Sequence, residues 1–278
     1  MLLEVKDLDI SYGDKLTVTG ASLELDKGEI MSIVGESGSG KTTVIRAIMG
    51  CLPGAGRVSR GSIIFDGKDV LQNTPDEWRK MYGSEMSMIF QDSGNMINPI
   101  RRIGQQFIDY VQAHQPDKSK DQAYKMCCDM LTNVRLPNPE NIMNSYPFEL
   151  SGGMRQRVMI AMALACNPKI LIADEPTTAL DVTIQAQIME LIVRLNEQLN
   201  MGVMLITHDL AVVAQTCSRV IVMYLGQIVE EADVLTLFDH PCHPYTEGLM
   251  RSIPRMEGDR TKPLYMICLL YTSDAADD

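Results

Sequence analysis

The chain has 278 residues, 45% of them hydrophobic and 22% charged, which is typical of a folded globular protein and excludes a largely disordered chain. Its 36 acidic residues outnumber the 25 basic ones and give a net charge of −11, the wrong sign for the basic surface of most nucleic-acid-binding proteins. The longest uncharged apolar runs hold about six residues, whereas a membrane-spanning helix needs ~20. We therefore expect no nucleic-acid partner and no membrane-spanning segment.

The N-terminal residues predict half-buried strands. Leu3, Val5 and Leu8 alternate with charged residues, and Leu23 and Leu25 repeat the alternation, which is the two-residue period of a strand with one buried face. We expect these strands to form an antiparallel sheet. The first residues lack the basic-then-apolar order of a secretory signal, so we expect the chain to remain in the cytosol.

Three later segments are almost wholly apolar. They lie at residues 30–34, 170–173 and 203–206, and they have the composition of strands that are buried on both faces. Between the last two, apolar residues recur at helical spacing over residues 184–199, which predicts an amphipathic helix and therefore a βαβ unit. The more polar stretch from about residue 101 to 150 carries helical patterns and predicts a helical insertion.

A glycine-rich loop follows the first apolar strand. It fits the pattern G-x-x-x-x-G-K-[ST] and consists of Gly35, Glu36, Ser37, Gly38, Ser39, Gly40, Lys41 and Thr42. Glycines in such a loop let backbone N–H groups surround an anion, and the following helix adds the partial positive charge of its N-terminus. We expect Lys41 to reach the β- and γ-phosphates of a nucleotide and Thr42 to bind Mg²⁺, with Thr43 beside them.

Two carboxylates follow the apolar strand at residues 170–173. Such an acidic pair alone is more often a helix cap or a turn, but the phosphate-binding loop upstream favours a catalytic role. We expect Asp174 to hold Mg²⁺ through its water shell. We expect Glu175 to polarise the water that attacks the γ-phosphate.

The segment Leu150-Ser151-Gly152-Gly153-Met154 resembles the signature of ATP-binding cassette (ABC) proteins. Ser151 is a candidate N-cap, and the glycines expose N–H groups at a helix start, which is a second anion-binding arrangement. The resemblance implies that two cassettes pair head to tail. The signature residues Ser151, Gly152 and Gly153 of one cassette would then close on the ATP that the phosphate-binding loop of the other holds.

Four further positions match the pattern of that family. By resemblance, Tyr12 would stack on adenine, and Gln91 would reach Mg²⁺ and link the ATP site to the helical insertion. Asp181 would cross the dimer interface, and His208 would contact the γ-phosphate. The resemblance implies ATP and Mg²⁺ as cofactors, and an α/β fold with a P-loop NTPase (RecA-like) core, an N-terminal antiparallel β lobe and an inserted helical subdomain.

Finer features resemble the ATPases of peptide and nickel importers. Residues 155–188 and the motif His243-Pro244-Tyr245-Thr246 are similar to that group, whereas residues 91–99 depart from it in the middle. The resemblance implies an importer of dipeptides or oligopeptides, with nickel or nickel chelates as the alternative cargo. The partners would be a second ATPase subunit, two transmembrane permease subunits and, indirectly, an extracytoplasmic solute-binding protein. Met154 in the signature favours a paralogue over an identical copy, and the chain would lie peripherally on the cytoplasmic face of the cell membrane.

Two rival classes fit less well. A soluble translation or DNA-repair protein of this family would usually carry two cassettes, and this chain has one phosphate-binding loop and one signature. A non-catalytic cassette would show a damaged Lys41, Glu175 or His208, and all three are present.

We predict the following division of the chain. Residues 1–98 and 163–250 form the ATP-binding core, residues 99–162 form the helical subdomain with the signature, and residues 251–267 begin a C-terminal extension. Residues 268–278 resemble one reading frame of a transposon-end adapter used in sequencing libraries, and three Asp in the last five residues give no basis for packing. We expect this tail to be non-native, with a natural acidic tail as the alternative.

Overall fold

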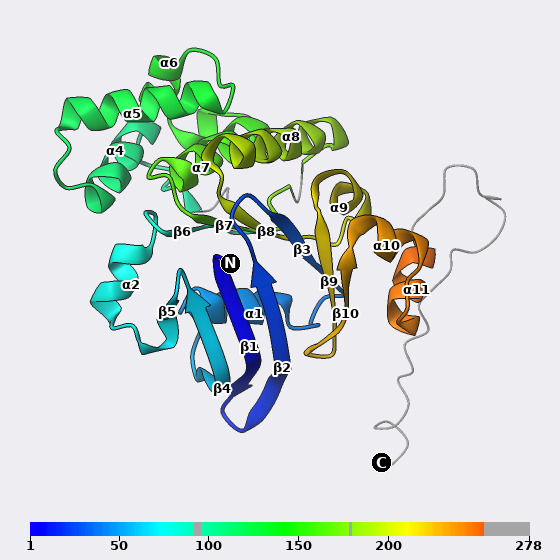
Figure 1. Ribbon diagram of the computed structural model, residues 1–278. Helices are drawn as coiled ribbons and strands as arrows, with labels where there is room; N and C mark the ends of the chain where they lie inside the picture. The colour runs from blue at the N-terminus through cyan, green and yellow to red at the C-terminus, as the bar shows by residue number, and fades with distance from the viewer. Residues whose placement is uncertain (92–95, 178–179, 253–278) are drawn as a thin grey trace, which may run out of the picture.

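The computed structural model describes residues 1–91, 96–177 and 180–252. In Figure 1 one sheet, with β6, β7 and β8, crosses the middle of the molecule, a second sheet, with β1, β2 and β4, lies below it, and a group of helices stands above both. The core that joins the two sheets encloses helix α1 (Lys41–Ile48), whose Val44, Ile45 and Ile48 are fully buried there. The phosphate-binding loop therefore precedes a helix that is fixed on both sides by apolar packing.

The N-terminal sheet is antiparallel, as predicted. Its strands run in the order β2-β1-β4-β5, and β1 pairs Leu3 with Leu25 and Val5 with Leu23. The apolar members of this alternation are all buried. The bounds are β1 (Leu3–Tyr12), β2 (Lys15–Leu25), β4 (Gly56–Phe65) and β5 (Lys68–Asp69).

The second sheet is mainly parallel and has the order β10-β9-β3-β8-β7-β6, with only β10 antiparallel to its neighbour. Every residue of β3, β7 and β8 is buried, as the apolar runs predicted. Because β7 and β8 are parallel neighbours joined by α8 (Val182–Leu199), the predicted βαβ unit is confirmed. The bounds are β3 (Ile30–Val34), β6 (Met86–Ile89), β7 (Ile170–Asp174), β8 (Gly202–Ile206), β9 (Arg219–Tyr224) and β10 (Gln227–Asp233).

Helices make up most of residues 103–164, where a helical insertion was predicted. They are α4 (Ile103–His114), α5 (Lys120–Asn133), α6 (Pro139–Asn144), the short 3-10 helix η2 (Pro147–Glu149) and α7 (Gly152–Leu164). Helix α7 ends a little beyond the predicted boundary at residue 162. The exact division of the chain into subdomains stays a prediction, and residues 253–278, which include the expected non-native tail, lie outside the described residues.

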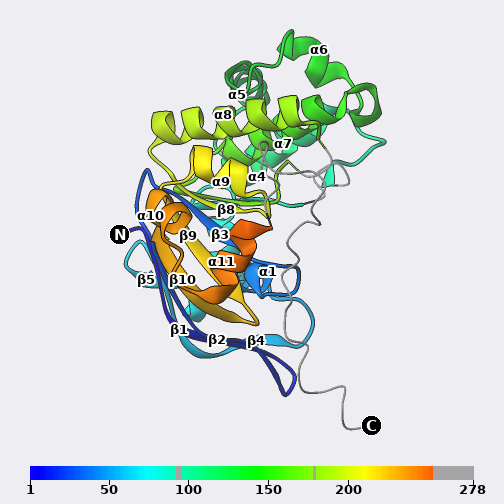
Figure 2. The same ribbon diagram turned by 90° about the vertical axis from the view of Figure 1, so that its right-hand side faces the viewer.

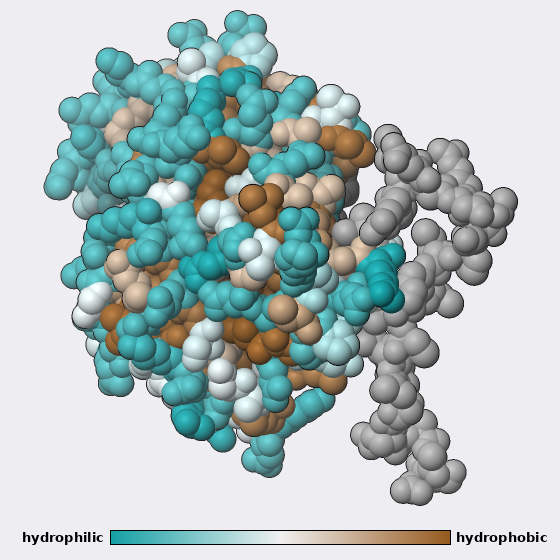
Figure 3. All heavy atoms as spheres, turned by 45° about the vertical axis from the view of Figure 1, so that its right-hand side comes forward, coloured by the Kyte–Doolittle hydropathy of each residue, from teal (hydrophilic) through white to brown (hydrophobic). Residues whose placement is uncertain are grey.

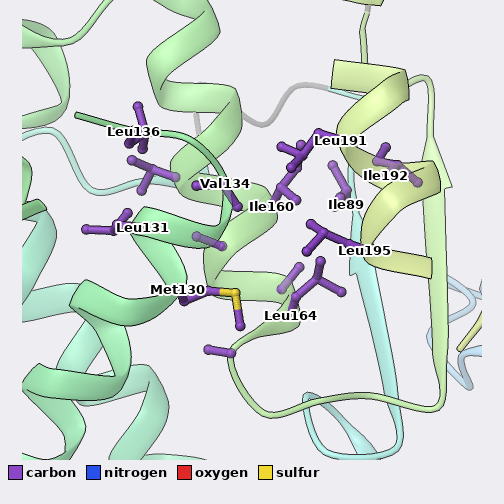
Figure 4. Close-up of a cluster of buried hydrophobic side chains, with 14 of the residues drawn as sticks. Ile89, Met130, Leu131, Val134, Leu136, Ile160, Leu164, Leu191, Ile192 and Leu195 are labelled. Atoms are coloured by element: carbon purple, nitrogen blue, oxygen red, sulfur yellow. The ribbon is translucent and has the colours of Figure 1, made fainter. Parts of the chain in front are cut away.

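One apolar cluster ties this insertion to the parallel sheet. In Figure 4, Ile160 and Leu164 of α7 lie between the side chains around α5 and those of α8, and Ile89 of β6 lies close to the α8 side chains. All of these residues belong to the same buried cluster, which also takes in Phe107 of α4. The insertion and the catalytic core thus share one hydrophobic core through α7 and α8.

Among the described residues, the remaining helices are short. They are η1 (Val70–Gln72), α2 (Pro75–Met81), α9 (Leu210–Thr216), α10 (Val234–Asp239) and α11 (Pro244–Arg251). In the part of the chain that the structure describes, no helix is long and apolar enough to span a membrane. The face in Figure 3 is hydrophilic over most of its area, with separate apolar patches.

A glycine in the turn between β9 and β10 joins both sheets to the phosphate-binding loop. The N–H of Gly226 donates to the carbonyl of Ser39 over 3.0 Å, and its own carbonyl accepts from the N–H of Thr19 over 2.9 Å. Its φ is +79°, and a Cβ at this position would lie 2.1 Å from the carbonyl oxygen of Thr17. Only glycine fits this crossing point without displacing backbone.

We expect Gly226→Ala to lower the free energy of unfolding by at least about 2 kcal/mol, because it adds a backbone clash to an unfavourable φ. Gly13→Ala is the matched control. Gly13 has a φ of +59° but no atom within 4 Å of the added Cβ, so its cost should stay near 1 kcal/mol. Urea denaturation of both variants measures the difference. Equal losses would show that the clash is absorbed without cost.

Candidate active site

The carboxyl ends of the parallel strands surround a cavity of about 410 Å³. Loops that follow parallel strands meet at one edge of the sheet, which is where such folds bind ligands. The predicted residues 35–43 line this cavity except for Ser39, which is buried beneath it. Loops after three other strands contribute the rest of the predicted lining, which consists of Gln91, Asp174, Glu175 and His208.

The ammonium group of Lys41 is held inside its own loop. Its Nζ donates to the carbonyl oxygens of Gly35 and Glu36 over 2.8 and 2.7 Å, and to the hydroxyl of Ser39 over 3.3 Å. Burial lowers the pKa of Lys41, and the nearby charges of Glu175, Asp174 and Glu36 oppose that shift. A buried cation surrounded by carbonyl groups is a good partner for the phosphates of a nucleotide.

The backbone of the loop also suits phosphate. Gly38 and Gly40 have φ values of +83° and +103°, which L side chains rarely adopt. A Cβ at Gly35 would lie 2.2 Å from the carbonyl oxygen of Met223, so the loop starts in close contact with β9. These glycines let the chain turn its N–H groups inward ahead of α1, as an anion cradle requires.

Strand β7, which β8 separates from β3, ends in a carboxylate beside the loop. The hydroxyl of Thr42 donates to Asp174 Oδ2 over 3.5 Å. Burial raises the pKa of Asp174, and the charge of Glu175 adds to that shift, while Thr42, Arg46 and Lys41 oppose it. Hydroxyl and carboxylate oxygens are ligands that Mg²⁺ accepts.

This donor set fits Mg²⁺ only in company with a nucleotide. Among the residues with a described structure, no three or more His, Cys, Asp or Glu side chains come together as a metal-binding group. Mg²⁺ is typically held by one or two carboxylates together with substrate phosphates and water. Thr42 and Asp174, with Gln91 nearby in the same cavity, would supply the protein's share.

Glu175 lies at the centre of the predicted catalytic residues. Its Oε2 accepts a hydrogen bond from Gln91 Nε2 over 2.8 Å, and its Oε1 lies 3.1 Å from His208 Nδ1. Its backbone N–H donates to the carbonyl of Ile206 over 2.8 Å, and its φ is +47°. Three loops therefore converge on one carboxylate that is held in an uncommon backbone conformation, which is a frequent property of active sites.

The signature residues lie outside this cavity. The hydroxyl of Ser151 accepts a hydrogen bond from the N–H of Met154 over 3.3 Å, so the predicted N-cap of α7 is confirmed. Asp181 caps α8 in the same way through the N–H of Ile184. Neither cap, nor Gly152 or Gly153, lines the cavity of its own chain.

Tyr12 is not brought to the cavity either. It ends β1, where a Cβ on Gly56 would lie 2.7 Å from Tyr12 Cε1, and it is not among the lining residues. Two lining residues were not predicted. Ile206 ends β8 just before His208, and Thr17 comes from the antiparallel sheet. The position of Ile206 before the histidine could have indicated it, whereas Thr17 carries no local signal.

The chain matches two models of known protein families. Residues 18–178 match the ABC transporter family, and residues 229–267 match the C-terminal region of oligopeptide/dipeptide transporters. The oligopeptide transport ATP-binding protein OppD of Bacillus subtilis is 49% identical over 271 residues, which cover 96% of this chain and 75% of the relative. The dipeptide transport ATP-binding protein DppD of Escherichia coli is 45% identical over 265 residues, or 94% and 81% of the two chains.

The chain is also similar to solved structures of ABC proteins. The structure of cbiO1 from Clostridium perfringens, part of an ABC transporter complex, aligns with a TM-score of 0.76 and 28% identity over 86% of this chain and 91% of that one. A dimeric ATP-binding cassette bound to ADP and phosphate aligns with a TM-score of 0.73 and 28% identity, covering 84% of this chain and 99% of that one.

The fold and its cavity define a P-loop nucleoside triphosphatase, as the sequence predicted. More narrowly, the chain belongs to the ABC transporter family and is an ATP-hydrolysing subunit of that family.

We expect Glu175→Gln to keep ATP binding largely intact and to reduce turnover below a tenth of wild type, a rise in barrier of at least ~1.4 kcal/mol. The amide retains the size of the side chain but polarises water weakly. Glu190→Gln is the control, because Glu190 lies on the exposed surface of α8 and pairs with Arg135. Steady-state phosphate release and equilibrium ATP binding measure the two effects. Turnover above a tenth of wild type in Glu175→Gln would remove Glu175 from the catalytic role.

Proposed function

We propose that this protein powers an importer of dipeptides or oligopeptides. The match of residues 229–267 to the C-terminal region of oligopeptide/dipeptide transporters carries the proposal, because the cassette itself is common to ABC ATPases of many cargoes. The relatives named for oligopeptide or dipeptide transport span nearly the whole chain. Both observations favour peptides over the alternative cargo, nickel.

The residues that line the cavity would have different roles in ATP hydrolysis. Lys41 neutralises charge on the β- and γ-phosphates, and the loop glycines orient them. Glu175 polarises the attacking water and accepts its proton, while Gln91 and His208 hold the carboxylate from two sides. Mg²⁺, when bound, supplies further neutralisation of phosphate charge. Thr42, Asp174 and Gln91 would hold it.

Two cassettes would form each complete ATP site. Ser151, Gly152, Gly153 and Asp181 lie at the exposed starts of α7 and α8 rather than in the cavity of their own chain, which favours a role against the nucleotide of a partner cassette. We infer that the partner is a paralogue rather than an identical copy, on the basis of Met154 in the signature.

Import of a peptide across the membrane would require further protein partners. Two transmembrane permease subunits would carry the peptide, and a solute-binding protein outside the membrane would deliver it. This chain would lie peripherally on the cytoplasmic face of the membrane. The helical insertion shares its apolar core with β6 and α8, so closure of two cassettes would be passed on to the insertion through these contacts.

We expect cells that carry only the Glu175→Gln variant to take up labelled dipeptides or tetrapeptides at less than a tenth of the wild-type rate, because transport needs hydrolysis. Uptake of radioactive Ni²⁺ by the same cells should not change. Cells with Glu190→Gln should match wild type in both assays. Loss of nickel uptake with intact peptide uptake would overturn the peptide assignment.

A second expectation concerns assembly. Ser151→Arg should leave ATP binding by the isolated chain within two-fold of wild type, because Ser151 does not line the cavity. It should lower ATPase activity of the assembled transporter at least ten-fold, since the added side chain would stand at the nucleotide of the partner. Lys41→Ala should instead weaken ATP binding by the isolated chain. Titration with a fluorescent ATP analogue and phosphate release separate the two. Full ATPase activity in Ser151→Arg would contradict the composite site.

A further inference from the structure

The C-terminal part of the chain contacts the phosphate-binding loop directly. The hydroxyl of Tyr245, in the first turn of α11, accepts a hydrogen bond from the backbone N–H of Glu36 over 2.9 Å. The two residues are 209 positions apart in the sequence. Tyr245 is 5% exposed, and Figure 2 shows α11 at the front of the molecule. A side chain from outside the cassette motifs therefore holds one peptide group of the ATP site.

The position of Tyr245 is fixed by its neighbours. Its ring stacks on that of Tyr224, with centroids 4.4 Å apart and an angle of 28° between the planes. It packs in a buried cluster with Val34, the last residue of the strand that leads into the loop. His243 caps α11, since its Nδ1 accepts from the N–H of Tyr245 over 3.1 Å. The hydroxyl is thus aimed at the loop by packing and by a cap.

A carboxylate on β10 anchors the turn that precedes α11. Glu230 accepts hydrogen bonds from the backbone N–H groups of Cys242 and His243, over 2.7 and 3.0 Å. Because β10 pairs with β9 in the main sheet, the path from the sheet to Tyr245 consists of short, defined contacts. The helix start cannot shift without breaking them.

Both the backbone N–H and the carbonyl oxygen of Glu36 form hydrogen bonds. While its N–H donates to Tyr245, its carbonyl oxygen accepts from Lys41 Nζ over 2.7 Å and from the N–H of Ser39 over 3.2 Å. The residue also lines the ATP cavity. Loss of the Tyr245 acceptor would leave a backbone N–H without its partner at the start of the loop and favour other loop conformations.

We propose that Tyr245 is a positioning residue for ATP binding, and that through it the segment from Glu230 to α11 holds the phosphate-binding loop ready for nucleotide. This role uses the ATP site of the family but does not depend on the peptide cargo. A loop that spends less time in its binding conformation has a weaker apparent affinity in proportion. Coupling is reciprocal, so bound nucleotide also protects the start of α11.

The test is Tyr245→Phe in the full chain, which removes the hydroxyl and keeps the stacked ring. Tyr224→Phe is the matched control, because it alters the partner ring of the same stack. We expect Tyr245→Phe to raise the Kd of Mg²⁺-ATP about five-fold, the equivalent of ~1 kcal/mol, and to speed amide exchange at Glu36 in the absence of nucleotide. Tyr224→Phe should change the Kd less than two-fold.

The thermal midpoint without nucleotide separates positioning from general stability. Positioning is supported if the two variants melt within a few degrees of each other while only Tyr245→Phe loses affinity. An unchanged Kd in Tyr245→Phe, or the same loss of affinity in both variants, overturns the proposal. Either result leaves the peptide-import assignment intact, because uptake of peptides tests that separately.

Discussion

Parallel pairing among β3, β8, β7 and β6 is the constraint on which the active site depends. Parallel strands in register end at the same edge of a sheet, and here each strand is followed by one functional loop. The pairs Ile33 with Ile206 and Asp174 with Ile206 show that the strands end level with one another. The phosphate-binding loop, the two carboxylates and the histidine therefore meet because each lies at or just after the end of its strand.

Burial then sets the chemistry at that edge. Lys41 and Asp174 are less than a tenth exposed, and desolvation disfavours the charged form of each. Each group is partly compensated by the other's charge, so the two depend on a common arrangement. A ligand that brings phosphate oxygens to Lys41 and a divalent cation to Asp174 would relieve both penalties together.

Much of the site was predictable because its residues follow buried strands within short motifs. The loop at residues 35–42, Asp174 and Glu175 are contiguous with apolar runs that are visible in the sequence. The cap at Ser151 was predictable for the same local reason. The clustering of Gln91, Glu175 and His208 required the family pattern, since no local feature relates residues so far apart.

Other features depend on contacts that no local pattern records. The contribution of Thr17 arises only when the antiparallel sheet docks on the main sheet, and the contact of Tyr245 with Glu36 joins opposite parts of the chain. The parallel strands were predictable, but their order in the sheet was not. An apolar run indicates a buried strand without indicating which other strand it pairs with. Glu175 combines a positive φ with a backbone hydrogen bond to Ile206, and neither is indicated by the sequence around it.

The caps on α7 and α8 have a consequence for how sequences of this kind can drift. Ser151 and Asp181 each satisfy an N–H group at the start of a helix, and only Ser, Thr, Asn and Asp do this well, with alanine costing about 1 kcal/mol. If the same side chains also face a second cassette, two independent selective pressures act on one position. Neutral substitution is then confined to the few residues that both fold the helix and suit the neighbour.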